Sequence, residues 1–237
     1  MNALLPENNA QALAALVMRF APVEMGGAVG DVIRYCKRTP LAENVLLDRH
    51  TPYVHGVFYL QVLQGLGFYS DYSHHYVYVP KDADPSKLQV FFHGYAGNFL
   101  YYVECFEQYY SGVYPVVFPT TRGVSGIFTE TALQTFLQSS WMNDNYDEGM
   151  QGCRFVGLSN GGSGVSSAYK LSDGKAADYI YLSCSSRFNT AKIKVVGGTN
   201  DRSFGTMRRN RVRRFQGEDH SLLFAQTKEV VDVITKE

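Results

Sequence analysis

The sequence predicts an α/β fold: a mostly parallel sheet covered by helices on both faces, with no large cap domain. Apolar runs of strand length alternate with amphipathic runs of helix length from about residue 75 onward. Such alternation provides the crossover connections that parallel strands require. The chain has 237 residues, enough for one sizeable core. Only the segment SCSSRFNTAK separates two of the later strands, which leaves no room for a helical cap.

The composition excludes partners that are recruited by bulk charge. Lys and Arg total 22, Asp and Glu total 22, and the formal net charge is zero. This balance argues against binding to duplex nucleic acid or to an anionic membrane. With 45% hydrophobic and 19% charged residues, the chain has the composition of a folded globular protein rather than a disordered one.

The ends and the cysteines carry few signals. No run approaches the roughly 18 apolar residues of a membrane span, and the first residues lack the pattern of a signal peptide. We therefore expect a cytoplasmic protein, although a secreted protein whose signal has been removed would have the same N-terminus. Cys36, Cys105, Cys153 and Cys184 have no metal-ligand spacing, so we expect free thiols and no bound metal.

The strands are expected to be short and, from the third to the seventh, largely apolar, as strands buried on both faces are. The first two form a hairpin or two sequential strands ahead of the turn KDADPS. The expected strands are residues 67–72, 75–79, 88–92, 114–118, 154–158, 179–183, 194–197 and 211–215. The expected helices of this region are residues 98–110, 130–141, 162–170 and 222–234. Residues 1–50 have helical periodicity but no recognisable chemistry, so we treat them as an N-terminal helical extension of unknown role.

A G-x-S-x-G pattern, from Gly157 to Gly161, lies where an apolar strand meets a helix rich in small residues. A sharp strand-to-helix turn holds its central serine in a strained conformation, and the glycines let strand and helix approach closely. Ser159 would then be presented at the carboxyl edge of the sheet, as a nucleophile is. The alternative is a Gly/Ser-rich turn without chemistry.

A serine nucleophile needs an imidazole base that is oriented by a carboxylate. His220 is the only histidine that follows Ser159, and it lies in a loop after the last expected strand. Asp201 follows a strand and fits as the acid, whereas Asp173 and Asp178 precede theirs and would lie at the opposite edge. Asp219 is adjacent to His220, so we expect its side chain to diverge from the imidazole and to be a surface charge.

An oxyanion hole requires two backbone N–H groups that point to where negative charge develops. Asn160, the residue after the serine, would provide one, and Tyr95, in the loop after the strand LQVFF, would provide the other. His93 precedes the nucleophile in a His-Gly dipeptide, so we expect its ring to support this loop by hydrogen bonding rather than to act as the base.

The order of these motifs along the chain resembles that of the α/β-hydrolase superfamily: His93-Gly94-Tyr95, then Gly157–Gly161, then Asp201 and finally His220. The stretch HHYVYVPKDADPSKLQVFFHG is also similar to the start of the small uncapped esterases of the feruloyl-esterase and polyhydroxyalkanoate-depolymerase type. Those proteins often have a cysteine in the oxyanion loop and alanine after the nucleophile, where this chain has Tyr95 and Asn160. The resemblance implies that residues 51–237 form an α/β-hydrolase catalytic domain.

The resemblance implies a serine hydrolase that cleaves carboxylic esters through an acyl-enzyme intermediate and uses a Ser-His-Asp triad without a cofactor. Its substrate would be a small-molecule or polymeric ester, and neither nucleic acid nor a membrane span is expected. An amidase, a peptidase or an acyl thioesterase would use the same triad. A non-catalytic binding protein that retains the scaffold is the alternative from another class. The oligomeric state stays open.

Three further residues are candidates for the substrate pocket: Phe99, at the start of an aromatic helix, and Arg122 and Ser125, in a Gly-rich loop. Most aromatics of that helix are expected to cover the sheet. The arginines of MRRNRVRRF precede the His220 loop in the expected edge strand. They either prevent edge-to-edge pairing or bind an anionic substrate tail, such as a phosphate or a coenzyme A moiety.

Overall fold

A computed structural model of the chain describes residues 75–95, 102, 105–106, 108–119, 126–138, 142–143, 146 and 149–236, with the backbone alone at 75 and 76. The N-terminal extension (residues 1–50), the expected strand at 67–72, Cys36 and the three candidate pocket residues lie outside this set. The other seven expected strands all lie within it.

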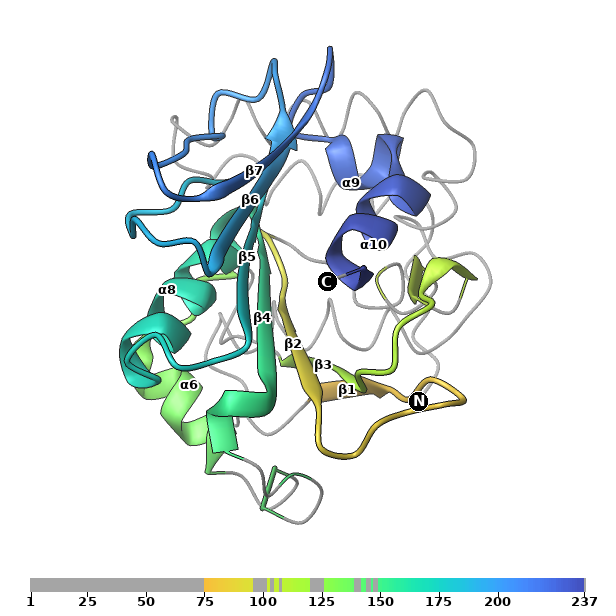
Figure 1. Cartoon of the computed structure of the whole chain (residues 1–237), viewed down its shortest axis with the longest axis vertical. Coiled ribbons are helices and arrows are strands. Elements are labelled where there is room, and N and C mark those ends of the chain that lie inside the picture. Colours follow the sequence, from red (N-terminus) through yellow and green to blue (C-terminus); the bar gives the residue numbers. More distant parts are fainter. Residues whose placement is uncertain are drawn as a thin grey trace, which may run out of the picture.

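The described strands form one seven-stranded sheet (Figure 1). They are β1 (His75–Tyr78), β2 (Leu88–Phe92), β3 (Val116–Pro119), β4 (Cys153–Leu158), β5 (Asp178–Leu182), β6 (Ile193–Gly198) and β7 (Arg211–Phe215). Their order is β1-β3-β2-β4-β5-β6-β7, and only the pairing of β1 with β3 is antiparallel. These pairings confirm the predicted mostly parallel sheet. Strands β2 and β4 to β6 are buried along nearly their whole length, as strands covered on both faces are.

The parallel register brings the carboxyl ends of the central strands to one edge. Leu158 at the end of β4 is paired with Leu182 of β5, and Leu182 with Val196 of β6. Gly198, the last residue of β6, is paired with Phe215, the last residue of β7. Loops that follow β4, β6 and β7 therefore meet at the same edge of the sheet.

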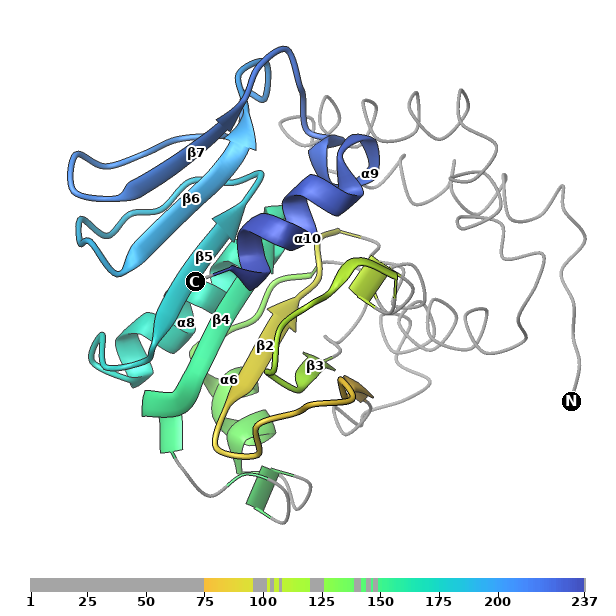
Figure 2. The same ribbon diagram turned by 45° about the vertical axis from the view of Figure 1, so that its right-hand side comes forward.

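Helices cover both faces, as predicted. They are α6 (Glu130–Leu137), α8 (Gly162–Leu171), α9 (Leu222–Ala225) and α10 (Thr227–Thr235). Figure 2 shows α6 and α8 on one side of the sheet and α9 and α10 on the other, and each side buries its own hydrophobic cluster. The prediction of one closing helix over 222–234 was wrong, because Gln226 leaves helical geometry (φ −129°, ψ 46°) and separates α9 from α10.

The aromatic segment before β3 covers the sheet. Tyr102 and Phe106 are buried, and both contact Phe91 of β2, with ring centroids 5.1 and 5.8 Å away. Phe118 of β3 completes the group, at 5.5 Å from Phe106. The expected covering role is confirmed for the described rings.

The connections on either side of β6 contain no helix, although every residue from β5 to β7 is described. In place of helices, Phe188 and Phe204 pack against the hydrophobic cluster on the α8 side of the sheet. This absence of a helical insertion agrees with the uncapped fold that the short segment before β6 predicts.

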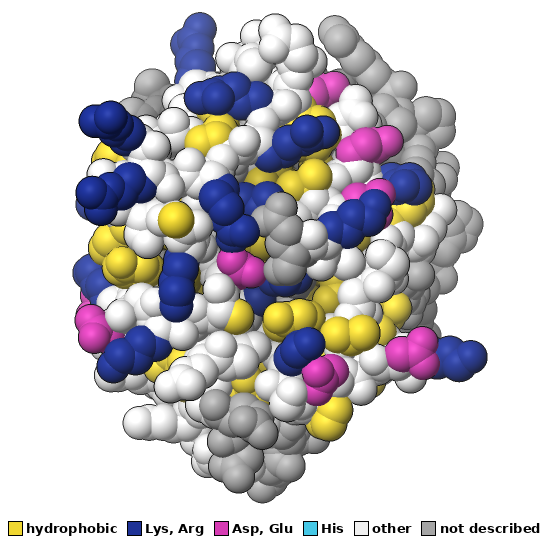
Figure 3. Space-filling model, viewed as in Figure 1, with side chains coloured by type: hydrophobic (Ala, Val, Ile, Leu, Met, Phe, Trp, Pro, Cys, Tyr) yellow, Lys and Arg dark blue, Asp and Glu magenta, His cyan; other side chains and the backbone are white. Residues whose placement is uncertain are grey.

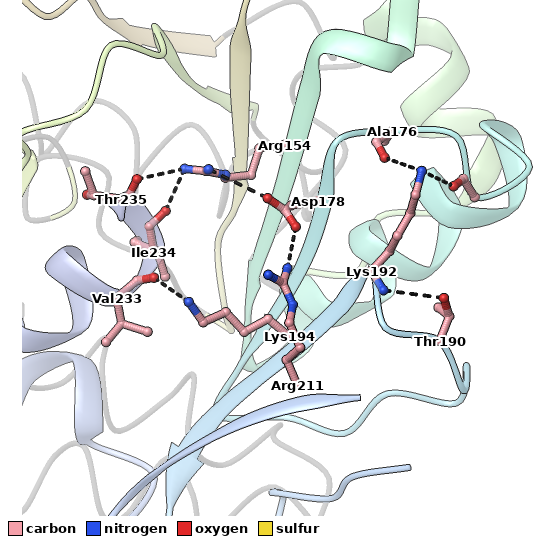
Figure 4. A network of polar contacts seen from close by, with 11 residues as sticks. Arg154, Ala176, Asp178, Thr190, Lys192, Lys194, Arg211, Val233, Ile234 and Thr235 are labelled. Carbon is pink, nitrogen blue, oxygen red and sulfur yellow. Dashed lines mark hydrogen bonds and ion pairs between the residues drawn. The ribbon is translucent and has the colours of Figure 1, made fainter. Parts of the chain in front are cut away.

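Buried cations hold the C-terminal helix at the opposite, amino edge of the sheet (Figure 4). Arg154 of β4 donates to the carbonyl oxygen of Ile234 (2.9 Å), and Lys194 of β6 donates to that of Val233 (2.8 Å). The carboxylate of Asp178 lies between Arg154 (3.7 Å) and Arg211 (2.5 Å). Cations at this end of α10 satisfy carbonyls that lack helical partners and oppose the helix dipole.

Cys105, Cys153 and Cys184 are buried, and Cys153 and Cys184 are free thiols, as expected for cysteines outside a disulfide framework. Among the described residues, no helix has the length and apolar character that crossing a bilayer requires.

Candidate active site

The turn after β4 holds Ser159 in a conformation that few residues other than glycine adopt. Its φ is +52°, and it begins a short 3-10 helix, η2 (Ser159–Gly161), that leads directly into α8. A Cβ atom on Gly157 would overlap the carbonyl oxygen of Gly161, and one on Gly161 would overlap that of Phe92 at the end of β2. The two glycines are therefore required by close backbone approach, and backbone strain is stored at the serine between them.

Three side chains from three loops form one hydrogen-bonded chain. Nε2 of His220 lies 2.9 Å from Oγ of Ser159, and Nδ1 of His220 lies 3.0 and 3.1 Å from the two carboxylate oxygens of Asp201. Since a carboxylate only accepts, Nδ1 carries the proton and the Nε2 lone pair faces the serine hydroxyl. Asp201 and His220 are 7% and 6% exposed, so water does not compete for this contact.

The turn after β6 fixes the carboxylate of Asp201. The backbone N–H of Ser203 donates to its Oδ1 (2.8 Å), and that of Phe204 donates to its carbonyl oxygen (3.2 Å). A Cβ on Gly198 would overlap the carbonyl oxygen of Glu218, so the loop that carries His220 passes directly over the end of β6. Asp201 and His220 are thus held by the ends of adjacent strands.

The other carboxylates that the sequence offers lie elsewhere. Asp219 accepts hydrogen bonds from the backbone N–H (2.8 Å) and hydroxyl (2.6 Å) of Ser221, so it closes a turn just before α9. Asp178 begins β5 at the amino edge and is paired with Arg154 and Arg211. Asp173 is exposed in the turn between α8 and β5.

The loop after β2 lies against the Ser159 turn. A Cβ on Gly94 would lie 3.3 Å from that of Ser159 and 3.2 Å from the carbonyl oxygen of Leu158. Tyr95 follows directly and is partly buried. On the other side, Asn160 is held through its carbonyl oxygen, which accepts from the Ser163 hydroxyl at 2.7 Å. Both expected oxyanion donors therefore belong to backbone that borders the serine.

His93 supports this loop from inside the core. It is fully buried, and its Nδ1 donates to the carbonyl oxygen of Gly94 at 2.7 Å. Burial lowers its pKa to about 4, although the bond to Gly94 opposes the shift, so the ring is neutral at pH 7. The hydroxyl of Tyr102 shares a hydrogen bond with the backbone of Gly94. These contacts agree with the supporting role expected for His93.

The low pKa of His93 makes stability depend on pH. Between pH 6.5 and 4 the unfolded chain binds a proton that the folded protein excludes, so the free energy of unfolding should decrease as pH falls, by up to about 3 kcal/mol. Urea unfolding at several pH values measures this slope. His93→Asn keeps an N–H donor for Gly94 but cannot titrate, and should remove this part of the slope. An equal slope in both proteins would contradict the assignment.

Cys184 is a neighbour of the site that the sequence did not reveal. Its thiol donates to the carbonyl oxygen of Gly157 at 3.6 Å, and a Cβ on Gly162 would lie 2.7 Å from its sulfur. Burial raises its pKa to about 12, so it remains a thiol beneath the serine turn and is not a second nucleophile. Cys184, Ser163 and Tyr102 have no sequence signal, since each contacts backbone from another segment. For Ser163 this contact is the backbone N–H of Phe128, which donates to its hydroxyl oxygen at 2.8 Å.

The candidate pocket residues Phe99, Arg122 and Ser125 are outside the described residues. The end of the loop that contains Arg122 and Ser125 is described. A Cβ on Gly126 (φ +65°) would lie 2.6 Å from the carbonyl oxygen of Gly94, so the backbone at Gly126 packs directly against the loop after β2. Within the described part of the chain, no group of three or more His, Cys, Asp or Glu side chains is placed to hold a metal ion.

Comparisons with known proteins give structural likeness only. No protein-family model matches the chain, and no curated protein matches its sequence. An S-formylglutathione hydrolase from Agrobacterium tumefaciens is similar in structure at 13% identity and a TM-score of 0.49, over 71% of this chain and 93% of that one. The feruloyl esterase module from Clostridium thermocellum is similar at 13% identity and a TM-score of 0.47, over 68% of this chain and 81% of that one. A carboxylesterase structure from the thaumarchaeon Nitrososphaera gargenis is similar at 16% identity and a TM-score of 0.46, over 70% of this chain and 94% of that one.

The sheet itself identifies the fold. Ser159, in a strained turn, follows β4, the middle strand of the sheet, and Asp201 and His220 follow β6 and β7 at the same edge. The loop that borders the serine follows β2, the neighbour of β4 on the other side. This strand order, with one antiparallel strand at the far edge and these loops at the carboxyl ends of the parallel strands, is that of the α/β-hydrolase fold.

Proposed function

We propose that this protein is a serine hydrolase that cleaves carboxylic esters through an acyl-enzyme intermediate. The observation that carries the proposal is the hydrogen-bonded chain from Ser159 through His220 to Asp201, with distances of 2.9 and 3.0 Å. A serine hydroxyl at the end of such a chain can lose its proton to the imidazole as it attacks a carbonyl carbon.

In the first half of the reaction, Oγ of Ser159 bonds to the ester carbonyl carbon while Nε2 of His220 takes the hydroxyl proton. Asp201 keeps the imidazole in the Nδ1–H tautomer and stabilises the imidazolium that forms. When the tetrahedral intermediate collapses, the carbon–oxygen bond to the alcohol breaks. His220 then transfers the proton from Nε2 to the departing oxygen.

In the second half, His220 takes a proton from water as the water oxygen attacks the acyl-enzyme carbonyl. Collapse of this second intermediate breaks the bond to Ser159, which regains the proton from His220, and releases the carboxylic acid. Each intermediate carries its negative charge on the former carbonyl oxygen, which the backbone N–H groups of Tyr95 and Asn160 stabilise. A donor of this kind contributes on the order of 3 kcal/mol to transition-state stabilisation. The N-terminus of α8, directly behind Ser159, adds a favourable dipole.

A panel of acyl donors tests the proposal. We expect the purified protein to hydrolyse nitrophenyl esters of short or medium chain length and to react with a fluorophosphonate that labels serine nucleophiles. Peptide anilides and acyl thioesters are assayed in parallel. They distinguish the amidase, peptidase and thioesterase alternatives, which share the triad. Turnover of none of these donors, together with no labelling, would favour a non-catalytic binding protein and would contradict the proposal.

A further inference from the structure

The part of the chain around β6 and β7 is strongly basic. Between residues 187 and 214 the only acidic residue is Asp201, whose carboxylate is occupied by His220. Seven cations of this segment have exposed side chains: Arg187, Lys192, Arg202, Arg208, Arg209, Arg213 and Arg214. Figure 3 shows Lys and Arg side chains gathered over the region where Figure 1 places β6 and β7. The zero net charge of the chain therefore hides a local excess of positive charge.

These cations lie at two different edges of the sheet. Arg211 is paired with Lys194 near the start of β6 and binds Asp178, which places it at the amino edge, away from His220. Arg208 and Arg209 precede it in the loop before β7, and the backbone N–H of Arg209 donates to the side-chain oxygen of Asn189. The sequence places all the arginines of MRRNRVRRF just before the His220 loop, but half of that segment is remote from the candidate site.

Arg202 and Arg214 lie at the edge that carries the candidate site. Arg202 directly follows Asp201, in the turn that the Phe204 N–H closes by donating to the Asp201 carbonyl oxygen. Arg214 is paired with Gly197 near the end of β6, and its guanidinium carbon lies 5.7 Å from the centre of the Phe204 ring. Phe204 therefore connects Arg214 to the turn that carries Arg202 and Asp201, and stacking on an aromatic ring restrains the Arg214 guanidinium.

The direction of the leaving group follows from the order of the strands. His220 returns its proton to the leaving atom, so the leaving group lies on the side of Ser159 where His220 is. The loop after β2 that would bind the oxyanion is on one side of β4, whereas β5, β6 and β7 are on the other. At the usual strand spacing, β6 and β7 lie about 10 and 14 Å from β4. A leaving group that extends from Ser159 past His220 thus approaches Arg202 and Arg214.

We propose that Arg202 and Arg214 bind a phosphate-bearing tail on the leaving group of the substrate. The inference rests on the proposed hydrolase function and specifies its substrate class: an ester or thioester whose alcohol or thiol carries a phosphate about 10 to 14 Å from the reacting carbonyl. Guanidinium groups bind phosphate through two parallel hydrogen bonds, which an ammonium cannot do. Protection of the β7 edge would explain Arg213 and Arg214, but it does not explain Arg202, which lies in a turn outside the strand.

Two thioesters with the same acyl group test this assignment. Butyryl-coenzyme A has a long arm that ends in phosphates, and butyryl-N-acetylcysteamine has the same thioester on a short neutral thiol. We expect the wild type to prefer the coenzyme A ester in kcat/KM. The double variant Arg202→Gln/Arg214→Gln should lose about 10- to 100-fold of that kcat/KM, mainly through KM, while its rate on the neutral thioester changes by less than about twofold.

The matched control is Arg208→Gln/Arg209→Gln, which removes two exposed arginines from the amino edge. It should leave both rates nearly unchanged, whereas a diffuse electrostatic attraction would lower the coenzyme A rate equally in both double variants. Equal use of the two thioesters by the wild type, or an equal loss in the control, would overturn the inference.

Binding separates this inference from the proposed function. Calorimetric titration of coenzyme A into the Ser159→Ala protein measures the tail site without turnover, and the same titration is repeated with the arginine variants in that background. Binding that is lost only with Arg202 and Arg214 supports the tail site even if no substrate is hydrolysed. Absence of binding in a protein that hydrolyses neutral esters contradicts the tail site and leaves the hydrolase function intact.

Discussion

Replacing Ser159 with alanine is expected to lower kcat for any ester substrate on the order of 10⁶-fold and to abolish labelling by a fluorophosphonate. The substitution removes the oxygen that would attack the carbonyl, and the nearby Cys184 thiol cannot replace it, because that thiol is buried and its pKa is raised to about 12. Alanine retains the Cβ of serine and adds no atom, so the fold should be unaffected. Single-turnover kinetics and mass spectrometry of the labelled protein measure the two effects.

Ser166→Ala is the control for this variant. Ser166 lies on α8, which follows the Ser159 turn, and its hydroxyl bonds the carbonyl oxygen of Gly162 (2.9 Å) and the Tyr181 hydroxyl (3.0 Å) rather than His220. We expect Ser166→Ala to keep its labelling and most of its activity. Labelling of the Ser159→Ala protein at wild-type rate would show that another residue is the nucleophile.

Replacing Gly161 with alanine is expected to reduce both stability and activity. The new Cβ would overlap the carbonyl oxygen of Phe92 and lie 2.8 Å from that of His93, and both belong to backbone that cannot rotate away. Overpacking of this kind costs about 1 to 3 kcal/mol. The turn has to move to relieve it, and a displacement of about 1 Å at a nucleophile can cost on the order of 100-fold in rate. Urea unfolding and kcat/KM on a nitrophenyl ester measure the two losses.

Gly205→Ala is the matched control, because its new Cβ would meet Oγ of Ser185 at 2.6 Å, the end of a side chain that can rotate. We expect a loss below about 1 kcal/mol and little change in kcat/KM. If Gly161→Ala were as stable and active as Gly205→Ala, the close approach of β2 to the serine turn would not be a requirement of the site.

Much of the fold could be predicted because local pattern and tertiary role coincide. The apolar runs that became β2, β4 and β6 are buried on both faces, so their hydrophobicity alone marks them. The closing helix was harder, because the break at Gln226 between α9 and α10 follows no glycine or proline. A break of that kind is decided by how the two segments pack on the sheet.

Among the candidate site residues, those with a local cause were the predictable ones. The glycines at 157 and 161 mark a turn that few other residues tolerate. Asp201 and His220 each follow a strand, and the carboxyl ends of parallel strands share one edge of a sheet, so their positions in the chain already indicate a common location. The support given by Cys184, Ser163 and Tyr102 is different. Each contacts backbone from another part of the chain, and a buried thiol or hydroxyl looks the same in the sequence whether it packs beneath a site or elsewhere.

The sequence alone determined that the sheet is mostly parallel, that the candidate site lies at the carboxyl ends of its strands, and which side chains could form a triad. Strand patterns and turns flanked by glycines are local properties of the chain, so they can be recognised without the tertiary structure. Only the tertiary structure decided that Ser159, His220 and Asp201 lie within hydrogen-bond distance, and only it divided the arginines between two edges of the sheet. Residues that are neighbours in the sequence of β7 can still lie at different distances from the site, because this strand of five residues has one end at each edge of the sheet. Its register with β6 decides which end lies beside the site.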